Sequence, residues 1–167
     1  MKQKVLWVED GAHGDLPDLI APVNVEGSYA LTIAFNATEA ISNLVANKYS
    51  AVIVDIRLPP GDDQRWIDIY NSPDTNKNAE RLGLLILRSL LQPEKSEVKI
   101  PRVPWISADV IGVLTVENQD EVQGDLDELK IKVYRQKNKK PSPNTLLKLI
   151  REVMENATRS VNAQEHR

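Results

Sequence analysis

The chain has 167 residues, of which 41% are hydrophobic and 27% charged, so we expect one globular domain and not a disordered or low-complexity chain. It has no cysteine, and its two histidines, His13 and His166, lie far apart, which excludes disulfide frameworks, thiolate or multi-histidine metal sites and cysteine nucleophiles. The net charge of −3, with no basic cluster longer than residues 137–140, argues against nucleic acid as a partner.

Short apolar runs alternate with helical patterns along the chain, which is typical of β-α-β units around a parallel sheet. The runs at 5–8 and 51–54 are continuously apolar, as in strands that are covered on both faces. The five predicted strands are residues 5–8, 29–34, 51–54, 103–106 and 131–136. We therefore predict an α/β protein built on a five-stranded parallel sheet.

Three helices are predicted from apolar spacing and capping residues. The first follows Asn36, a good N-cap with Glu39 three residues later. The second covers residues 79–91, and the third begins at Ser142-Pro143 and is followed by a polar C-terminal tail at 157–167. Their inward-facing residues are Ala40, Ile41, Leu44 and Val45, then Leu82, Leu85, Ile86 and Leu90, then Leu146, Leu147, Ile150, Val153 and Met154.

Three stretches fit this pattern poorly. Residues 11–28 should hold a helix, yet Pro22 should end or kink it. Residues 58–77 form a long polar connection, in which Trp66 either pins the loop to the domain or offers an anchor for a partner. Residues 109–129 combine a strand-like run at 110–116 with an acidic segment that could be helical.

Polar side chains follow the carboxyl ends of four predicted strands. They are Glu9 and Asp10, Asp55, Ser107 and Lys137. Ligands of open α/β sheets bind outside this edge, so we expect these groups to converge there. Three carboxylates repel one another unless a cation is present, and oxygen ligands with a phosphate suit Mg²⁺. A carboxylate beside Mg²⁺ can attack phosphorus and form an aspartyl phosphate.

The order and spacing of these residues resemble the receiver domain of bacterial response regulators. The matching segments are VLWVED at 5–10, AVIVDIRLP at 51–59, WISA at 105–108 and YRQK at 134–137. The resemblance covers nearly the whole chain and implies a receiver domain over residues 1–156. It also implies the family fold, a doubly wound, flavodoxin-like three-layer αβα sandwich with strand order 2-1-3-4-5.

The resemblance further implies a role for each site residue. Asp55 would accept the phosphoryl group. Glu9, Asp10, Asp55 and the backbone carbonyl of Arg57 would hold Mg²⁺. Ser107 would be the switch hydroxyl, Tyr134 the switch aromatic, and Lys137 the partner of the phosphoryl group.

The family also implies partners. The phosphoryl donor would be a sensor histidine kinase or a histidine phosphotransfer protein of a two-component phosphorelay, and the output would be contact with an unknown downstream protein. The chain would be a stand-alone signalling module and not an enzyme, and homodimers through residues 109–135 are possible. No apolar run approaches the ~20 residues of a membrane span or forms a signal-peptide core, so we expect a cytoplasmic protein.

The sequence departs from the family at the end of the fifth strand. The family usually has Lys-Pro there, whereas Lys137 is followed by Asn138 and Lys140-Pro141 comes three residues later. Lys137 is preferred because Tyr134 precedes it at the family spacing, and Lys140 stays an alternative.

Two other functions are considered. The chain could be a phosphorylation-independent adaptor, or pseudo-receiver, with the Trp66 loop and residues 109–129 as its docking surface. It could also be a Mg²⁺-dependent phosphohydrolase of the haloacid dehalogenase type, but those enzymes use Asp-x-Asp and here Arg57 occupies the second position. No Gly-rich nucleotide-binding motif is present.

Overall fold

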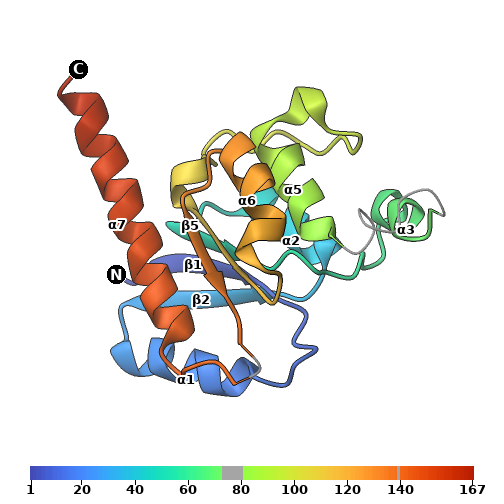
Figure 1. The fold of residues 1–167 in the computed structure, drawn as a ribbon. Helices are drawn as coiled ribbons and strands as arrows, with labels where there is room; N and C mark the ends of the chain where they lie inside the picture. The colour runs from blue at the N-terminus through green and yellow to red at the C-terminus, as the bar shows by residue number, and fades with distance from the viewer. Residues whose placement is uncertain (73–80, 139) are drawn as a thin grey trace.

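A computed structural model describes residues 1–72, 81–138 and 140–167. Five parallel strands form one sheet in the order β2-β1-β3-β4-β5, as predicted (Figure 1). The strands are β1 (Gln3–Val8), β2 (Tyr29–Ala34), β3 (Ala51–Val54), β4 (Ile111–Thr115) and β5 (Val133–Gln136).

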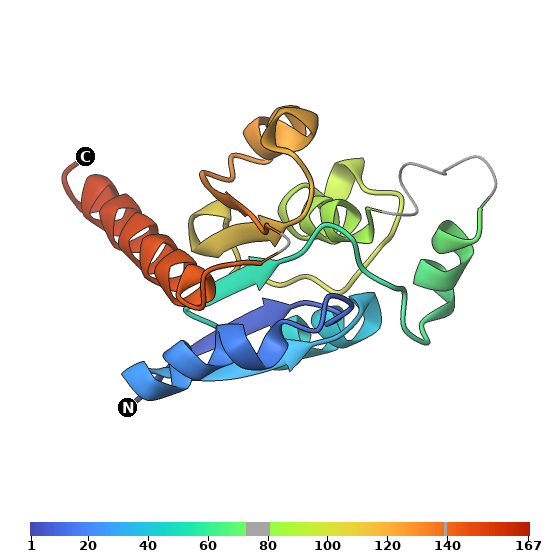
Figure 2. The same cartoon turned by 60° about the horizontal axis from the view of Figure 1, so that its bottom comes forward.

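Helices cover both faces of the sheet (Figures 1 and 2). On one face, α1 (Leu16–Glu26) and α7 (Thr145–Glu165) pack on the strand residues Val5, Trp7, Ile53 and Leu114. On the other face, α2 (Ala37–Ala46), α5 (Leu82–Leu91) and α6 (Gln119–Glu128) pack on the alternate residues of the same strands. The remaining elements are α3 (Gln64–Tyr70) and the 3₁₀ turns η2 (Pro93–Lys95) and η3 (Ala108–Val110). This alternation along continuously apolar strands confirms the three-layer prediction.

The fourth strand is not where the sequence pattern placed it. Residues 103–106 form no strand, and β4 is Ile111–Thr115 within the strand-like run at 110–116. Pro104 has no N–H to donate to a ladder, and a strand paired on both sides needs those donors. Gly112 also suits the central position, because a Cβ there would lie 2.7 Å from Val153 Cγ2 of α7. The prediction of a strand at 103–106 was therefore wrong.

Several helix boundaries also differ from the predictions. Pro22 lies inside α1, where the fully buried Leu19 and Val23 keep the helix packed on the sheet despite the missing N–H. Helix α5 begins at Leu82, and residues 79–80 lie outside the described part of the chain. Helix α7 begins at Thr145 and continues to Glu165, so most of the segment expected as a polar tail is helical.

Other local predictions are confirmed. The Asn36 side chain accepts a hydrogen bond of 2.8 Å from the Glu39 N–H and caps α2. The acidic segment after β4 forms α6. Trp66 on α3 is fully buried in the core, so it pins the long connection to the domain.

Among residues 1–72, 81–138 and 140–167, none of the helices combines the length and the apolar character that crossing a bilayer requires.

Candidate functional site

Three carboxyl groups meet at the carboxyl ends of two adjacent strands. Glu9 and Asp10 follow β1, and Asp55 follows β3. One oxygen of each lies within 4.8 Å of the others. Glu9 and Asp55 are buried, and Asp10 is partly exposed. The predicted convergence of these three residues is therefore present in the structure.

The loop after β1 is shaped to present these carboxylates. Gly11 has a φ of +75°, in the left-handed region that favours glycine. Its N–H donates to Glu9 Oε1 at 3.2 Å, and the Ala12 N–H donates to Asp10 Oδ1 at 3.1 Å. Both acidic side chains are thus held by the turn that follows them.

Burial disfavours ionisation of both buried carboxyls, and the charge of Asp55 adds to this effect at Glu9. Burial, with the neighbouring charge of Asp55, raises the pKa of Glu9 to about 8, although Lys137 and the Gly11 N–H oppose this shift. Burial also raises the pKa of Asp55, against hydrogen bonds from Thr115 and the Arg57 N–H and the charge of Lys137. A cation would relieve this repulsion.

Lys137 is the only lysine of the described residues that the structure places against these carboxylates. Its ammonium Nζ lies 2.8 Å from Glu9 Oε2 and 3.6 Å from Asp15 Oδ2, and its side chain is 1% exposed. Burial alone would lower the pKa of Lys137, but the hydrogen bond and charge of Glu9 raise it overall. Lys140 is exposed, so the structure favours Lys137 as the site lysine.

The hydroxyl at the end of β4 belongs to Thr115 and not to Ser107. Thr115 is the last residue of β4, and hydrogen bonding from its hydroxyl is the largest of the effects that lower the pKa of Asp55 against burial. Ser107 precedes η3 and β4, and Ile111 is in register with Val52, so Ser107 lies toward the amino end of the sheet. The predicted placement of Ser107 was wrong because it followed from the misplaced fourth strand. The usable signal was the apolar run 110–114, which ends at Thr115.

Arg57 and Tyr134 both contact Glu117, which the sequence analysis did not single out. The Arg57 N–H donates to Asp55 Oδ1 at 3.2 Å, while its Nε donates to Glu117 Oε1 at 2.7 Å. The Tyr134 hydroxyl donates to the Glu117 backbone carbonyl. Burial and the charges of Glu117 and Glu121 raise the pKa of Tyr134.

The donor set suits a hard divalent cation. It offers carboxylate oxygens with one ammonium group and no nitrogen or sulfur ligand. Oxygen ligands of this kind, together with waters and a phosphate, are what Mg²⁺ prefers.

The fold is shared with many solved structures, although no protein-family model and no curated protein matches the sequence. The CheY-like receiver domain of Methanospirillum hungatei JF-1 is 18% identical, with a TM-score of 0.61, and the match covers 96% of this chain and 99% of that one. The receiver domain of a Francisella response regulator is also 18% identical, with a TM-score of 0.57, covering 95% of this chain and 99% of that one.

The chain has the receiver fold. A third similar structure is the receiver domain of a sensor histidine kinase from Pseudomonas aeruginosa PAO1, which has a magnesium ion coordinated in its active-site cleft. It is 19% identical, with a TM-score of 0.54, and the match covers 93% of this chain and 99% of that one.

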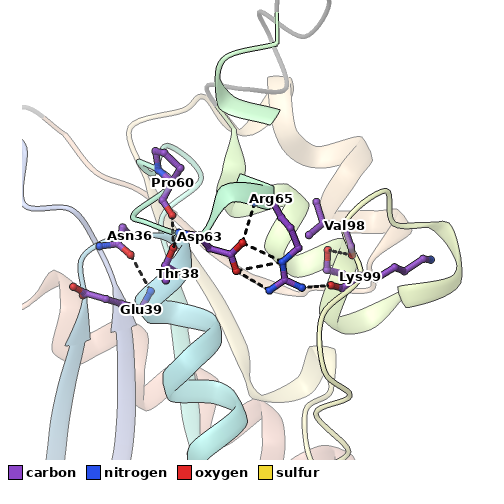
Figure 3. A network of polar contacts seen from close by, with 9 residues as sticks. Asn36, Thr38, Glu39, Pro60, Asp63, Arg65, Val98 and Lys99 are labelled. Atoms are coloured by element: carbon purple, nitrogen blue, oxygen red, sulfur yellow. Dashed lines mark hydrogen bonds and ion pairs between the residues drawn. The ribbon is translucent and has the colours of Figure 1, made fainter. Parts of the chain in front are cut away.

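In this receiver fold, the connection after Asp55 is fastened at both sides (Figure 3). The first two N–H groups of α2 donate to the carbonyls of Pro59 and Pro60 at 3.0 and 3.1 Å. The Thr38 hydroxyl also donates to the Pro60 carbonyl and accepts from the Asp63 N–H.

Arg65 holds the other side of this connection (Figure 3). Its Nη2 lies 2.6 Å from Asp63 Oδ2, and its Nη1 donates to the Lys99 carbonyl at 2.5 Å. The segment that follows the candidate acceptor is therefore anchored to α2 and to the segment after η2.

Proposed function

We propose that this protein is a response regulator receiver, which takes a phosphoryl group on Asp55 from a phosphohistidine and signals through protein contacts. The observation that carries the proposal is the set of groups around Asp55. The carboxylates of Glu9 and Asp10, the Thr115 hydroxyl and the Lys137 ammonium come from the carboxyl ends of three strands, β1, β4 and β5, and surround Asp55 at the end of β3.

The transfer conserves atoms and charge. Asp55 attacks the phosphorus with one carboxylate oxygen, the new O–P bond forms, and the N–P bond of the donor breaks with its electron pair left on the imidazole nitrogen. Lys137 and the Arg57 N–H stabilise negative charge on the transferring group, and Thr115 takes the role first assigned to Ser107 by donating to one phosphoryl oxygen.

Glu9, Asp10, Asp55 and the backbone carbonyl of Arg57 are the residues that would hold Mg²⁺. The ion, when bound, would neutralise charge on the phosphoryl group. The Lys137 ammonium donates a hydrogen bond to Glu9 in this structure. When Glu9 binds the cation, this hydrogen bond would weaken, and Lys137 would become available to the phosphoryl oxygens.

The donor would be a sensor histidine kinase or a histidine phosphotransfer protein in the cytoplasm. The phosphorylated protein would act as a signal, and no small-molecule substrate would be turned over. The added charge of roughly −1.5 to −2 is large enough to reposition the loops around Asp55. The response would be a shift between arrangements that already exist in the free protein.

The test is an amide NMR titration with Mg²⁺, followed by Mg²⁺ with beryllofluoride, a phosphoryl mimic. We expect shifts near Asp55, Thr115 and Lys137 in the wild type and none on beryllofluoride addition to Asp55→Asn. An absence of response in the wild type at saturating Mg²⁺ would refute the acceptor function and favour the phosphorylation-independent adaptor. Catalytic turnover of a small phosphate ester would favour the phosphohydrolase instead.

A further inference from the structure

Glu117 is a buried carboxylate that the acceptor chemistry does not use. It follows β4 by two residues, and its side chain is 3% exposed. Arg57 Nε lies 2.7 Å from Oε1, and Arg81 Nη2 lies 3.4 Å from Oε2. Burial opposes its ionisation, but hydrogen bonds from Arg57 and Glu121 and the charges of both arginines lower its pKa overall. Glu117 is thus an ionised group held between two guanidinium groups.

Two residues that contact Glu117, namely Arg57 and Thr115, also act on Asp55. Arg57 donates its backbone N–H to the Asp55 carboxylate at 3.2 Å. The Glu117 N–H donates to Thr115 Oγ1 at 3.4 Å, and the same hydroxyl is the group that most lowers the pKa of Asp55 against burial. A change at Asp55 therefore reaches Glu117 by two short routes.

The other contacts of Glu117 lead away from the site. Arg81 is the N-cap of α5, and its Nη2 also lies 3.6 Å from Glu121 Oε2 on α6. Tyr134 on β5 donates its hydroxyl to the Glu117 carbonyl. Glu117 therefore connects the two loops beside the acceptor to α5, α6 and β5.

The Arg57 side chain is 51% exposed and stands two residues from Asp55. A guanidinium group binds phosphate oxygens with two parallel hydrogen bonds, so a phosphoryl dianion on Asp55 would compete with Glu117 for it. Leaving a buried carboxylate without any partner would be costly, but Arg81 remains beside Glu117. The exchange of Arg57 is therefore possible without stranding a buried charge.

We infer that Glu117 is a positioning residue that holds the Arg57 guanidinium away from the acceptor in the resting protein and releases it to the phosphoryl group. The release loosens the loop after β4 and changes its contacts with Arg81 and Tyr134. This inference rests on the proposed acceptor function.

The test measures beryllofluoride binding at saturating Mg²⁺ in the wild type, Glu117→Gln, Arg57→Gln and the double variant. Glu117→Gln removes the competitor for Arg57, so we expect binding about five- to tenfold tighter than in the wild type. Arg57→Gln should bind more weakly, and Glu117→Gln should have no further effect in that background. Asp125→Asn is the matched control, because Asp125 also lies on α6 but pairs with Arg88 and has no contact with Glu117, Arg57 or Arg81 among the described contacts, so its affinity should equal that of the wild type.

A second readout needs no substitution at Glu117. The side-chain Nε–H resonance of Arg57 in the wild type should move when beryllofluoride binds, because its acceptor changes from carboxylate to fluoride. Two results would overturn this inference and leave the acceptor function standing. One is an Arg57 resonance that does not move although beryllofluoride binds, and the other is equal beryllofluoride affinity of the wild type and Glu117→Gln. If beryllofluoride bound to neither protein, the acceptor function itself would be wrong, and the inference would fall with it.

Discussion

The backbone of Asp55 and Ile56, directly after β3, lies against α5, and Gly83→Ala tests that contact. Gly83 is the second residue of α5, and its N–H donates to the Ile56 carbonyl at 2.9 Å. A Cβ at this position would lie 2.0 Å from the Asp55 carbonyl oxygen and 2.7 Å from Ile56 Cα. These are backbone atoms, which cannot turn aside as the end of a flexible side chain can.

The size of the effect follows from these distances. The nearest contact is roughly 1.4 Å shorter than an ordinary van der Waals contact, so α5 and β3 must separate. Overpacking of a core costs about 1–3 kcal/mol, and the clash with backbone at Gly83 belongs at the upper end of that range. Alanine is a better helix former than glycine by up to about 1 kcal/mol, which offsets part of the loss. We expect a net decrease of about 2 kcal/mol in the free energy of unfolding.

Gly124 provides a control with the same chemical change and the opposite expected sign. It lies inside α6, and a Cβ there would have no atom within 4 Å among its described neighbours. Gly124→Ala should therefore raise the free energy of unfolding by about 0.5–1 kcal/mol.

Urea unfolding of the wild type and both variants, followed by circular dichroism, measures these changes. A loss of 2 kcal/mol corresponds to a fall in Tm of about 4–8 °C for a domain of this size. Beryllofluoride affinity should also fall in Gly83→Ala, because the displaced backbone carries Asp55. If Gly83→Ala were as stable as Gly124→Ala, the close packing of α5 on the backbone of Asp55 and Ile56 would be refuted.

Three further predictions concern the site and its supporting loop. Thr115→Ala should weaken beryllofluoride binding by about 1 kcal/mol, the contribution of one hydrogen bond, whereas Ser107→Ala should bind as the wild type does. Equal affinities for all three proteins would contradict the assignment of Thr115. In the absence of Mg²⁺, the free energy of unfolding should fall as the pH rises from about 4.5 to about 8, because unfolded Glu9 ionises near 4.5 while folded Glu9 keeps its proton to about 8. Urea titrations between pH 5 and 8 measure how the free energy of unfolding changes with pH, and Glu9→Gln should reduce this change. A wild-type stability that rises through this range would show the assigned environment of Glu9 to be wrong. Trp66→Ala should cost about 3–5 kcal/mol in urea unfolding, since the indole is fully buried, and a cost below 1 kcal/mol would mean that the α3 segment is not pinned to the core.

Much of the fold was predictable because its signals are local. The continuously apolar runs before Glu9 and Asp55 identify central strands, and strand ends in a parallel sheet share an edge, so the acidic cluster followed from the sequence. Asn36 identified the start of α2 through a side-chain hydrogen bond that involves only neighbouring residues. The sequence also favoured Lys137 over Lys140, and in the structure Lys137 follows β5 directly, with its ammonium group 2.8 Å from Glu9.

The fourth strand was not predictable in the same way. Residues 103–106 and 110–116 are both apolar, and the choice between them depends on which run pairs with β3 and packs beneath α7. The misplaced strand carried the predicted switch hydroxyl with it, so one error in strand assignment also placed Ser107 wrongly. A stricter use of Pro104 as a break in the ladder would have favoured the second run.

The sequence by itself determined the acidic cluster and four of the five strands, because each depends on periodicity and on the residue that follows a strand, and it favoured Lys137 over Lys140. Only the tertiary structure decided that Thr115 meets Asp55, that Trp66 is buried, and that Glu117 lies between Arg57 and Arg81. These contacts join residues 36 to 60 positions apart or depend on how a long connection folds back, and no local pattern encodes such distances. They arise when packing of the helices on the sheet brings separate loops to one edge.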